Sequence, residues 1–474
     1  MLRIANWDHL EIRDEKYFIF WAEYPYWVVV NQSLYEILKI LRSGVERNIE
    51  ALASDLGIDH DKLSNTLNPL LKSGVIYYDE APPNVAPAPS SGFVEENVGI
   101  TGFTFHLTKA CNLRCKHCYA EAGLPSEDEL TASEFRKILE DALPYMNAQR
   151  KEVGLLGGEP LLVQDKFFEI ASWAFNTQTY ACGTSTNATL VTHEIARKAK
   201  DLRIVFQVSF EGATEASNDR IRGKGHFRRA VEAVEILRKE GVVAGIIMTI
   251  RQDNIHEIPG FLKLGVELNA SFIRTNFLKI QGRAEKYGLK MGKQLDILRL
   301  TYDAVRNDKQ LQEKMAFSTA GFIFSAMRLR PKYRNCGSGL TVPLIDSNGD
   351  VYPCQTLFLP EFKLGNVRKA SIVDIWFGNP NTKKLRELCV DTLNPKCSKC
   401  WLRYLCHGGC RGLTYNLTGS LSAPDVRCED FQRAYAEAAF IMGEDPDAFA
   451  PALSQFATFL YPDIINPSRS EKNG

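Results

Sequence analysis

Two periodicities of apolar and polar residues run along this chain of 474 residues. From residue 101, short apolar and β-branched runs alternate with longer segments in which apolar residues recur every three or four positions. The short runs predict strands at 101–107, 152–156, 180–186, 204–209, 243–250 and 272–277. The longer segments predict helices near 132–144, 166–176, 192–201, 226–240, 256–264 and 291–306. Such an α/β alternation predicts a parallel sheet with helices outside it, either open or curled toward a barrel.

A separate module precedes this alternation. Its pattern predicts two strands, three helices and a final strand, at 17–21, 27–30, 33–41, 49–56, 61–72 and 74–78. This order suggests a small winged-helix-like domain over residues 1–81. The Pro- and Ala-rich stretch that follows predicts an extended linker at 82–98.

The character of the chain changes again near residue 330. Helical periodicity weakens there, and eight of the twelve Cys follow. Because a thiol-dense, loop-rich segment generally owes its order to metal, we expect metal or clusters here. We therefore divide the rest of the chain into a strand–helix domain at 99–325, a Cys-rich domain at 326–440, and a C-terminal helix and tail at 441–474.

Composition and charge narrow the functions. Lys plus Arg (57) equals Asp plus Glu (57), so no global field attracts nucleic acid or an anionic membrane. The third predicted helix of the first module offers phosphates a single Lys between 61 and 67, which disfavours a DNA-binding winged helix. The N-terminus is charged where a signal peptide is apolar, and about 18 uncharged apolar residues never run together. We expect a cytoplasmic protein, in which Cys serve as metal ligands rather than disulfides.

Cys111, Cys115 and Cys118 form a CxxxCxxC loop directly after the first strand of the alternation. Three thiolates bind three irons of a four-iron cluster and leave the fourth open to a small molecule, whereas four Cys usually close such a cluster. Structural zinc, the alternative, prefers four closed ligands with CxxC pairs. At the end of a first strand the motif resembles the signature of radical S-adenosylmethionine (SAM) enzymes, which have a partial (β/α)6 barrel similar to a TIM barrel.

Further matches to this family stand at later strand ends, where α/β folds gather their chemistry. The resemblance implies that the GGEP run after the second strand binds the SAM amino group, that later strand ends contact ribose, carboxylate and adenine, and that two arginines can pair with the carboxylate. The implied SAM contacts are Gly157, Gly158, Glu159, Pro160, Ser185, Asn187, Ser209, Glu211, Arg220, Arg222 and Thr249. It also implies that Cys111, Cys115 and Cys118 hold the catalytic cluster, whose electron cleaves SAM to a 5′-deoxyadenosyl radical that abstracts a substrate hydrogen.

The later Cys resemble the SPASM extension of radical SAM peptide-modifying enzymes. The run CxxCx5CxxxC from Cys397 to Cys410 carries the closest likeness. The resemblance implies two auxiliary [4Fe-4S] clusters, and three in all. One would be held by Cys397, Cys400, Cys406 and Cys428, and the other by Cys336, Cys354 and Cys410. The second set has three thiolates, so a non-Cys ligand, Cys182, Cys389 or a substrate thiolate completes it. Cys182 lies in a predicted strand and Cys389 on a predicted helix, and we favour the interpretation that both are small buried side chains rather than ligands.

The strand and helix order of residues 1–81 resembles the PqqD-like recognition element of enzymes that mature ribosomally made peptides. That element captures a leader peptide by adding a strand to a sheet edge, which needs no basic surface. The three resemblances together imply a radical SAM peptide maturase that takes electrons from a donor such as flavodoxin or ferredoxin. Its expected product is an intramolecular crosslink, first a Cys thioether of the sactipeptide or ranthipeptide type.

Other functions stay open at this point. Carbon–carbon crosslinking, or another oxidation such as decarboxylation, would need the same motifs. A sulfatase-type formylglycine maturase is disfavoured because Gln355 stands where that branch has an acidic base. A cluster-binding regulator that contacts DNA is disfavoured by the complete set of SAM motifs.

Overall fold

The computed structural model describes residues 1–44, 47–78, 99–146 and 151–452. Its centre is a nine-stranded sheet in the order β11-β10-β9-β8-β7-β6-β12-β13-β14. The six strands predicted from the sequence pair in parallel with their chain neighbours, which confirms the α/β prediction. They are β6 (Gly102–His106), β7 (Glu152–Leu156), β8 (Ala181–Thr186), β9 (Val205–Phe210), β10 (Ala244–Ile250) and β11 (Ile273–Phe277).

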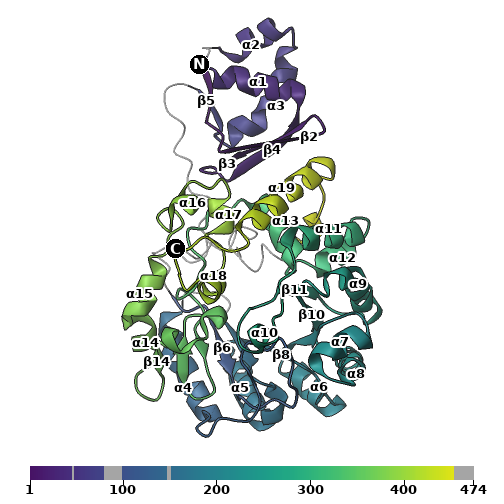
Figure 1. The fold of residues 1–474 in the computed structure, drawn as a ribbon, viewed down its shortest axis with the longest axis vertical. Helices are drawn as coiled ribbons and strands as arrows, with labels where there is room; N and C mark the ends of the chain where they lie inside the picture. The colour runs from purple at the N-terminus through teal and green to yellow at the C-terminus, as the bar shows by residue number, and fades with distance from the viewer. Residues whose placement is uncertain (45–46, 79–98, 147–150, 453–474) are drawn as a thin grey trace.

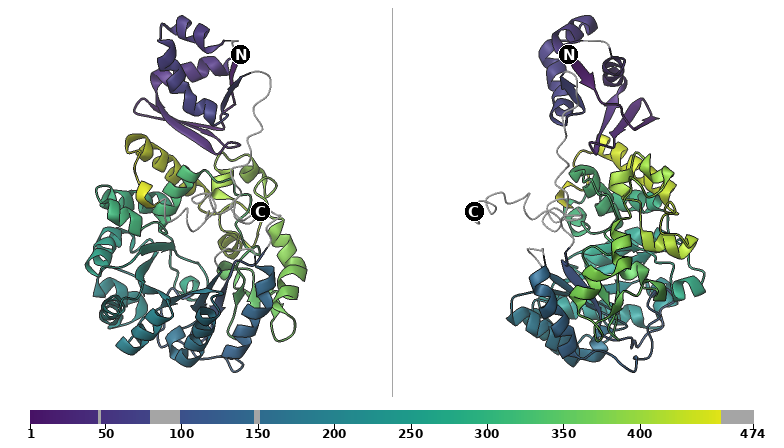
Figure 2. Two further views of the ribbon diagram at one scale, coloured as in Figure 1. Left: turned by 180° about the vertical axis from the view of Figure 1, so that it is seen from behind. Right: turned by 90° about the vertical axis from the view of Figure 1, so that its left-hand side faces the viewer.

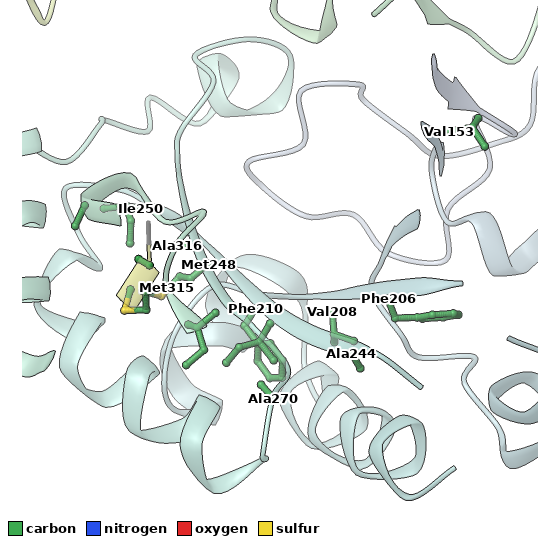
Figure 3. Close-up of a cluster of buried hydrophobic side chains, with 14 of the residues drawn as sticks. Val153, Phe206, Val208, Phe210, Ala244, Met248, Ile250, Ala270, Met315 and Ala316 are labelled. Atoms are coloured by element: carbon green, nitrogen blue, oxygen red, sulfur yellow. The ribbon is translucent and has the colours of Figure 1, made fainter. Parts of the chain in front are cut away.

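Helices cover the outer face of this sheet and leave its inner face to the site (Figure 1). They are α4 (Ala132–Ala142), α5 (Gln164–Asn176), α6 (His193–Asp201), α7 (Glu215–Arg222), α8 (His226–Lys239), α9 (Ile258–Glu267) and α11 (Gln294–Val305). Alternate strand residues divide between the two faces: Phe206, Val208 and Phe210 are fully buried against the helices (Figure 3), while Gln207 and Ser209 point the other way. The parallel strands therefore present polar side chains to an inner surface.

Three short strands extend the sheet beyond β6. β12 (Leu344–Ile345) runs parallel to β6, and β13 (Asp350–Tyr352) and β14 (Gly365–Asn366) follow in antiparallel pairing. Each is too short to show a period in the sequence, and none was predicted. Because β12–β14 belong to the Cys-rich segment, they fix that segment to the first strand of the barrel.

The N-terminal module has the predicted element order. β3 (Lys16–Trp21) and β4 (Tyr26–Asn31) form an antiparallel sheet with β2 (His9–Arg13), and β1 (Leu2–Ile4) pairs with β5 (Ile76–Tyr78). The helices are α1 (Gln32–Arg42), α2 (Ile49–Leu56) and α3 (His60–Lys72). The sequence missed β1 and β2, and the predicted linker at 82–98 lies outside the described residues.

The module is packed onto the rest of the chain through one face of its sheet. Ile19 and Trp21 face the module's own helices, whereas Phe18, Phe20 and Trp27 join the core that also contains the barrel. The Trp27 indole N–H donates to the Met327 carbonyl oxygen at 2.8 Å. Figures 1 and 2 show the Cys-rich segment and α19 (Cys428–Glu444) between the module and the barrel.

Short helices and loops make up the Cys-rich segment, as its weak periodicity predicted. They include α14 (Ile372–Gly378), α15 (Pro380–Arg386), α16 (Pro395–Ser398), α17 (Arg403–Cys406) and α18 (Arg411–Thr418). The long final helix α19 begins at Cys428, well before residue 441, and helices α10 (Arg283–Lys286), α12 (Lys309–Lys314) and α13 (Thr319–Leu329) precede the segment. Among the described residues, no helix is long and apolar enough to cross a membrane.

Candidate active site

The CxxxCxxC loop leaves the end of β6 and is fixed by backbone hydrogen bonds from several elements. The Cys111 N–H donates to the Gly123 carbonyl at 2.9 Å, and the Arg283 side chain donates to the Cys115 carbonyl at 2.8 Å. The Cys115 thiol is buried, and burial raises its pKa to about 11. This thiol is therefore protonated at neutral pH in the protein without metal. A cation or cluster that binds it displaces the proton.

The GGEP run at the end of β7 lies directly against this loop. The Gly158 N–H donates to the Thr108 carbonyl at 2.7 Å, and the Glu159 N–H donates to the Ala110 carbonyl at 2.8 Å. A Cβ atom on Gly158 would lie 2.0 Å from the Ala110 oxygen, so only glycine permits this approach. The run therefore holds the backbone that leads into Cys111.

Glu159 itself is turned into the protein. Its fully buried carboxylate accepts hydrogen bonds from the Thr186 hydroxyl at 2.6 Å and from the Asn187 N–H at 2.8 Å. Burial raises the pKa of this carboxyl, and the hydrogen bonds oppose that rise. The side chain thus joins the end of β7 to the end of β8, and Pro160 begins the short 3-10 turn that follows.

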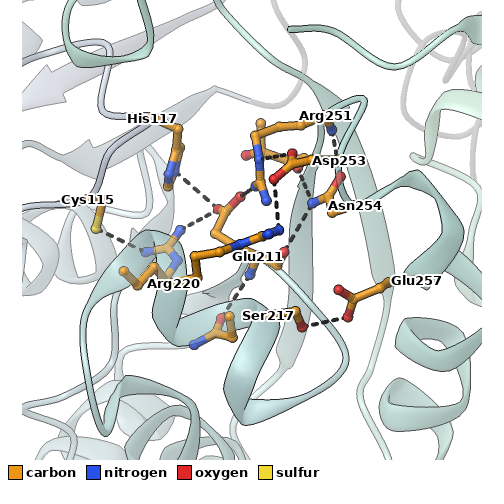
Figure 4. A network of polar contacts seen from close by, with 12 residues as sticks. Cys115, His117, Glu211, Ser217, Arg220, Arg251, Asp253, Asn254 and Glu257 are labelled. Carbon is orange, nitrogen blue, oxygen red and sulfur yellow. Dashed lines mark hydrogen bonds and ion pairs between the residues drawn. The ribbon is translucent and has the colours of Figure 1, made fainter. Parts of the chain in front are cut away.

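Glu211, at the end of β9, is the centre of a buried ionic network (Figure 4). Its carboxylate bonds Arg222 Nη2 at 2.9 Å, Arg251 Nη1 at 2.7 Å and His117 Nε2 at 3.1 Å. Burial raises the pKa of Glu211, and the two guanidinium groups oppose the rise. Because His117 stands between two Cys of the loop, the network ties the thiol loop to β9 and β10.

Both predicted carboxylate-binding arginines have partners within the chain. Arg222 lies between Glu211 and the Cys115 sulfur, which is 4.0 Å from its Nη1. Arg220 is half exposed and pairs with Asp253 at 2.8 Å. Their role toward SAM stays a prediction. Arg251 and His117 were missed: Arg251 is the first residue after β10, and its position directly past a strand end was the available signal.

Ser185, Asn187, Ser209 and Thr249 lie at the ends of β8, β9 and β10, as predicted. The Ser185 hydroxyl accepts from the Gln207 side chain at 3.2 Å, and the Asn187 side chain donates to Asn112 Oδ1 at 2.9 Å and lies 4.0 Å from the Cys111 sulfur. The structure therefore brings Asn187 to the thiol loop.

Arg274, on β11, was not predicted. It donates to the Gln207 oxygen at 3.1 Å, and burial lowers its pKa. It thus adds a cation to the inner face that carries Ser185 and Ser209.

Cys336, Cys354 and Cys410 gather beside β13 and around Thr356. The Thr356 hydroxyl lies 3.2 Å from the Cys354 sulfur and 3.5 Å from the Cys410 sulfur, and the Ser338 hydroxyl lies 3.4 Å from Cys354. Burial raises the pKa of Cys336 to about 11, and its two partner thiols add to that rise. Hydroxyls beside Cys354 and Cys410 are groups that can stabilise cluster sulfur.

Lys279, also missed by the sequence, connects this set to the SAM loop. Its ammonium donates to Gln355 Oε1 at 2.7 Å and lies 4.1 Å from the centre of the Tyr119 ring. Burial lowers its pKa to about 8, while Cys354 and Cys410 oppose the shift. Tyr119 directly follows Cys118, so the two thiol sites meet at this half-buried cation.

Cys397, Cys400, Cys406 and Cys428 line one small cavity together with Arg403 and Asp425. Side-chain amides point at two of the sulfurs: Gln432 donates to Cys400 and Asn394 donates to Cys397, each at 3.3 Å. Among the described residues, no three His, Cys, Asp or Glu side chains converge as ligands of a single metal ion. Four thiols around a shared cavity, with N–H donors behind them, fit an iron-sulfur cluster.

The other two thiols make no hydrogen bond to these sets among the described residues. Cys182 is buried on the helix-facing side of β8, as predicted. Cys389 was expected on a helix, but α15 ends at Arg386, and the Cys389 thiol donates to Asp391 Oδ2 at 3.3 Å in the following loop. All twelve thiols are free in this structure.

Comparison with known proteins agrees with the fold. Residues 105–265 match the radical SAM superfamily, and residues 336–401 match the iron-sulfur cluster-binding SPASM domain. A mycofactocin maturase, MftC, from Mycolicibacterium smegmatis is 30% identical over 330 residues, which cover 69% of this chain and 81% of the relative. An AdoMet-dependent heme synthase from Nitratidesulfovibrio vulgaris is 28% identical and covers 68% of this chain and 90% of its own length.

Solved structures show the same fold. SuiB from Streptococcus suis, bound to its precursor peptide SuiA, matches 90% of this chain and 100% of its own with a TM-score of 0.55 and 18% identity. The enzyme anSMEcpe with bound AdoMet matches 74% of this chain and 98% of its own with a TM-score of 0.59 and 19% identity. The fold and the thiol loops define an α/β enzyme of the cluster-binding class. The chain belongs to the radical SAM enzymes with a SPASM domain, and its cofactors are SAM and iron-sulfur clusters.

Proposed function

We propose that this enzyme matures a ribosomally made precursor peptide and installs an intramolecular crosslink in it, in the first place a Cys thioether. Two of the relatives support a peptide substrate: SuiB is bound to a precursor peptide, SuiA, and MftC is named a maturase. When bound, the three-thiol cluster supplies the electron that cleaves SAM to the hydrogen-abstracting radical. Cys111, Cys115 and Cys118 hold this cluster, and the strand-end residues from Gly157 to Thr249 bind SAM.

The arrangement of Cys336, Cys354 and Cys410 is the observation that carries the thioether proposal. Among the described residues, neither spare thiol makes a hydrogen bond to this set, since Cys182 faces the helices and the Cys389 thiol donates to Asp391. Three thiols then leave one iron of an auxiliary cluster open. A substrate thiolate can take that position, where the half-buried ammonium of Lys279 compensates its charge.

This position also lies next to the SAM loop. Lys279 contacts Gln355, the neighbour of Cys354, and the ring of Tyr119, the neighbour of Cys118. A substrate Cys bound at the auxiliary cluster therefore stands beside the site where hydrogen abstraction takes place. This placement favours carbon–sulfur bond formation, for which a cluster held by Cys336, Cys354 and Cys410 would supply the electron acceptor.

Residues 1–81 recognise the leader in this proposal. Both faces of the β2-β3-β4 sheet are covered, so peptide must bind at an edge, and β2 and β4 each pair with one strand among the described residues. Main-chain hydrogen bonds at such an edge give affinity without a charged surface. An electron donor such as flavodoxin or ferredoxin reduces the clusters.

Mass spectrometry of the peptide encoded by the neighbouring short open reading frame tests the proposal, after anaerobic reaction with the reconstituted enzyme, SAM and dithionite. A thioether removes two hydrogens and protects the Cys from alkylation. A carbon–carbon crosslink removes two hydrogens and leaves the thiol free, and a decarboxylation loses carbon dioxide; either outcome would reject the thioether. Cys354→Ala should keep uncoupled 5′-deoxyadenosine formation and lose the bridge, whereas Cys111→Ala should lose both.

Hydrogen exchange tests leader recognition separately. Adding the same peptide should slow exchange of backbone amides in residues 9–13 or 26–31, which form the two sheet edges. Unchanged exchange in both strands at saturating peptide would exclude edge binding by the module.

A further inference from the structure

The N-terminal module reaches the loop that carries the four-thiol set. Trp401, which directly follows Cys400, stacks on His9 of the module with ring centres 4.4 Å apart and an angle of 15° between the planes. The Phe20 ring packs edge-on against the same indole at 5.1 Å. Trp401 is 7% exposed, so the module buries it almost completely.

Arg403 makes the second connection, and it touches both sides. Its Nη1 donates to the Cys400 carbonyl at 3.0 Å, and the residue lines the cavity that the four thiols share. Its Nη2 pairs with Glu23 at 2.6 Å, and Nη1 lies 3.4 Å from Asp8. The guanidinium is buried, and both carboxylates paired with it come from the module.

The module holds the Asp8 carboxylate in a fixed position. The other Asp8 carboxylate oxygen accepts from the Ala22 N–H at 2.8 Å, and the Asp8 N–H donates to the Phe20 carbonyl at 2.9 Å. A buried guanidinium without its carboxylates is costly, and it would turn toward water. Removing the module's carboxylates therefore releases the side chain that supports the Cys400 carbonyl.

We propose that the N-terminal module is a structural part of the four-thiol cluster site, with Arg403 as the positioning residue that holds the loop from Cys397 to Cys406 in its ligand conformation. Module docking and cluster binding then stabilise each other, because a coupling free energy between two sites is reciprocal. This inference rests on the proposed assignment of Cys397, Cys400, Cys406 and Cys428 to one cluster.

Substitutions in the module, which lies far from the thiols in the sequence, test the inference. In the full-length, anaerobically reconstituted enzyme, the double variant Asp8→Asn/Glu23→Gln should lose about four iron atoms, one cluster, several-fold faster than the parent during incubation with a chelator. The electron paramagnetic resonance signal of one auxiliary cluster should change in the same variant, while uncoupled 5′-deoxyadenosine formation continues. Iron loss and spectra equal to those of the parent would overturn the inference.

Arg13→Gln is the matched control. Arg13 also joins the module to the body, through Glu437 of α19 at 2.6 Å, and its other contacts among the described residues are with Glu11 and the Phe440 ring, not with the thiol loop. This variant should retain its iron at the parental rate. Accelerated loss here as well would mean that general loosening of the module explains the effect, and would overturn the role of Arg403. Arg403→Met should behave as the module double variant does, and Arg403→Lys should recover part of the iron retention.

The reverse experiment separates the inference from the cluster assignment. Cys397→Ala/Cys428→Ala should lack one cluster and show faster hydrogen exchange in residues 16–21, where the module meets the body. A full iron content in this variant would refute the assignment of the thiols. Loss of the cluster with unchanged exchange would retain the assignment and overturn the coupling.

Discussion

Gly158→Ala should remove the SAM-binding cluster, because the added Cβ clashes with the backbone of the loop that leads to Cys111. The added Cβ would lie 2.0 Å from the Ala110 oxygen and 2.8 Å from the Lys109 oxygen, whereas ordinary contact begins at 3.4 Å. Neither oxygen belongs to a side chain that can rotate away. The loop that leads to Cys111 must therefore move outward by the difference between 3.4 and 2.0 Å.

The cost follows from what this movement breaks. Two hydrogen bonds join the segments, from Gly158 to Thr108 and from Glu159 to Ala110, and each contributes about 1 kcal/mol. Overpacking in a well-packed region adds about 1–3 kcal/mol. The local cost is therefore about 3–5 kcal/mol. The loop avoids much of this cost by shifting, and the shift displaces Cys111 from its ligand position.

Iron analysis and 5′-deoxyadenosine formation measure the result. Gly158→Ala should bind about four fewer iron atoms after reconstitution, form no 5′-deoxyadenosine, and keep the auxiliary clusters. Gly154→Ala is the control on the same strand, because a Cβ there meets its nearest neighbour, the Phe103 oxygen, at 3.7 Å. A Gly158→Ala enzyme that holds full iron and cleaves SAM at the parental rate would refute this account of the GGEP run.

Three further outcomes are expected. Glu211→Ala leaves two buried arginines without this carboxylate and should lower the free energy of unfolding in urea by about 3–5 kcal/mol. Glu215→Gln, at a half-exposed ion pair, is the control and should change that free energy by less than about 1 kcal/mol. Equal effects of the two substitutions would contradict the network. Lys332 and Arg403 hold the pKa of Glu23 at about 2 against the opposing effect of burial, so its stabilisation is complete above pH 4.5 and is lost as the pH falls toward 2. The difference in Tm between the parent and Glu23→Gln should shrink over that range, and a constant difference would contradict it. Chelating the iron should speed hydrogen exchange in residues 397–428 more than in β7–β10, whose core is apolar.

The sequence predicted the parallel strands because their pattern is strong and local. Each of the six has three or more apolar or β-branched residues among its five to seven positions, and each is followed by a helical period or a turn. Strand ends then placed the polar residues of the site, since parallel strands share one carboxyl edge. The resemblance to the SPASM extension implied two sets of thiols. In the structure four of them line one cavity, and three others lie near one another; their assignment to clusters stays a prediction.

Helix α7 and two charged residues of the site had no recognisable pattern in the sequence. α7 (Glu215–Arg222) buries Asn218 and Arg222 along with Ile221, so its inner face is polar and lacks the apolar period of a helix. Arg251 and Lys279 are single charged residues after strands, and a sequence cannot distinguish these from solvated loop residues. Their burial depends on Glu211 and on the Cys354 and Cys410 thiols, which come from distant segments.

The packing of the N-terminal module onto the rest of the chain is visible in the sequence as a run of strand residues without polar positions. A strand with one buried face alternates apolar and polar residues, but the run from Tyr17 to Trp21 is apolar throughout and indicates burial on both faces. One face covers the module's own core, and Phe18 and Phe20 on the other join the core of the body. Deleting the module would therefore expose apolar surface on α19 and around Trp401, and it would change the cluster site together with leader binding. For this reason single substitutions at the sheet edges and at Arg403, rather than a truncation, can separate recognition of the peptide from support of the cluster.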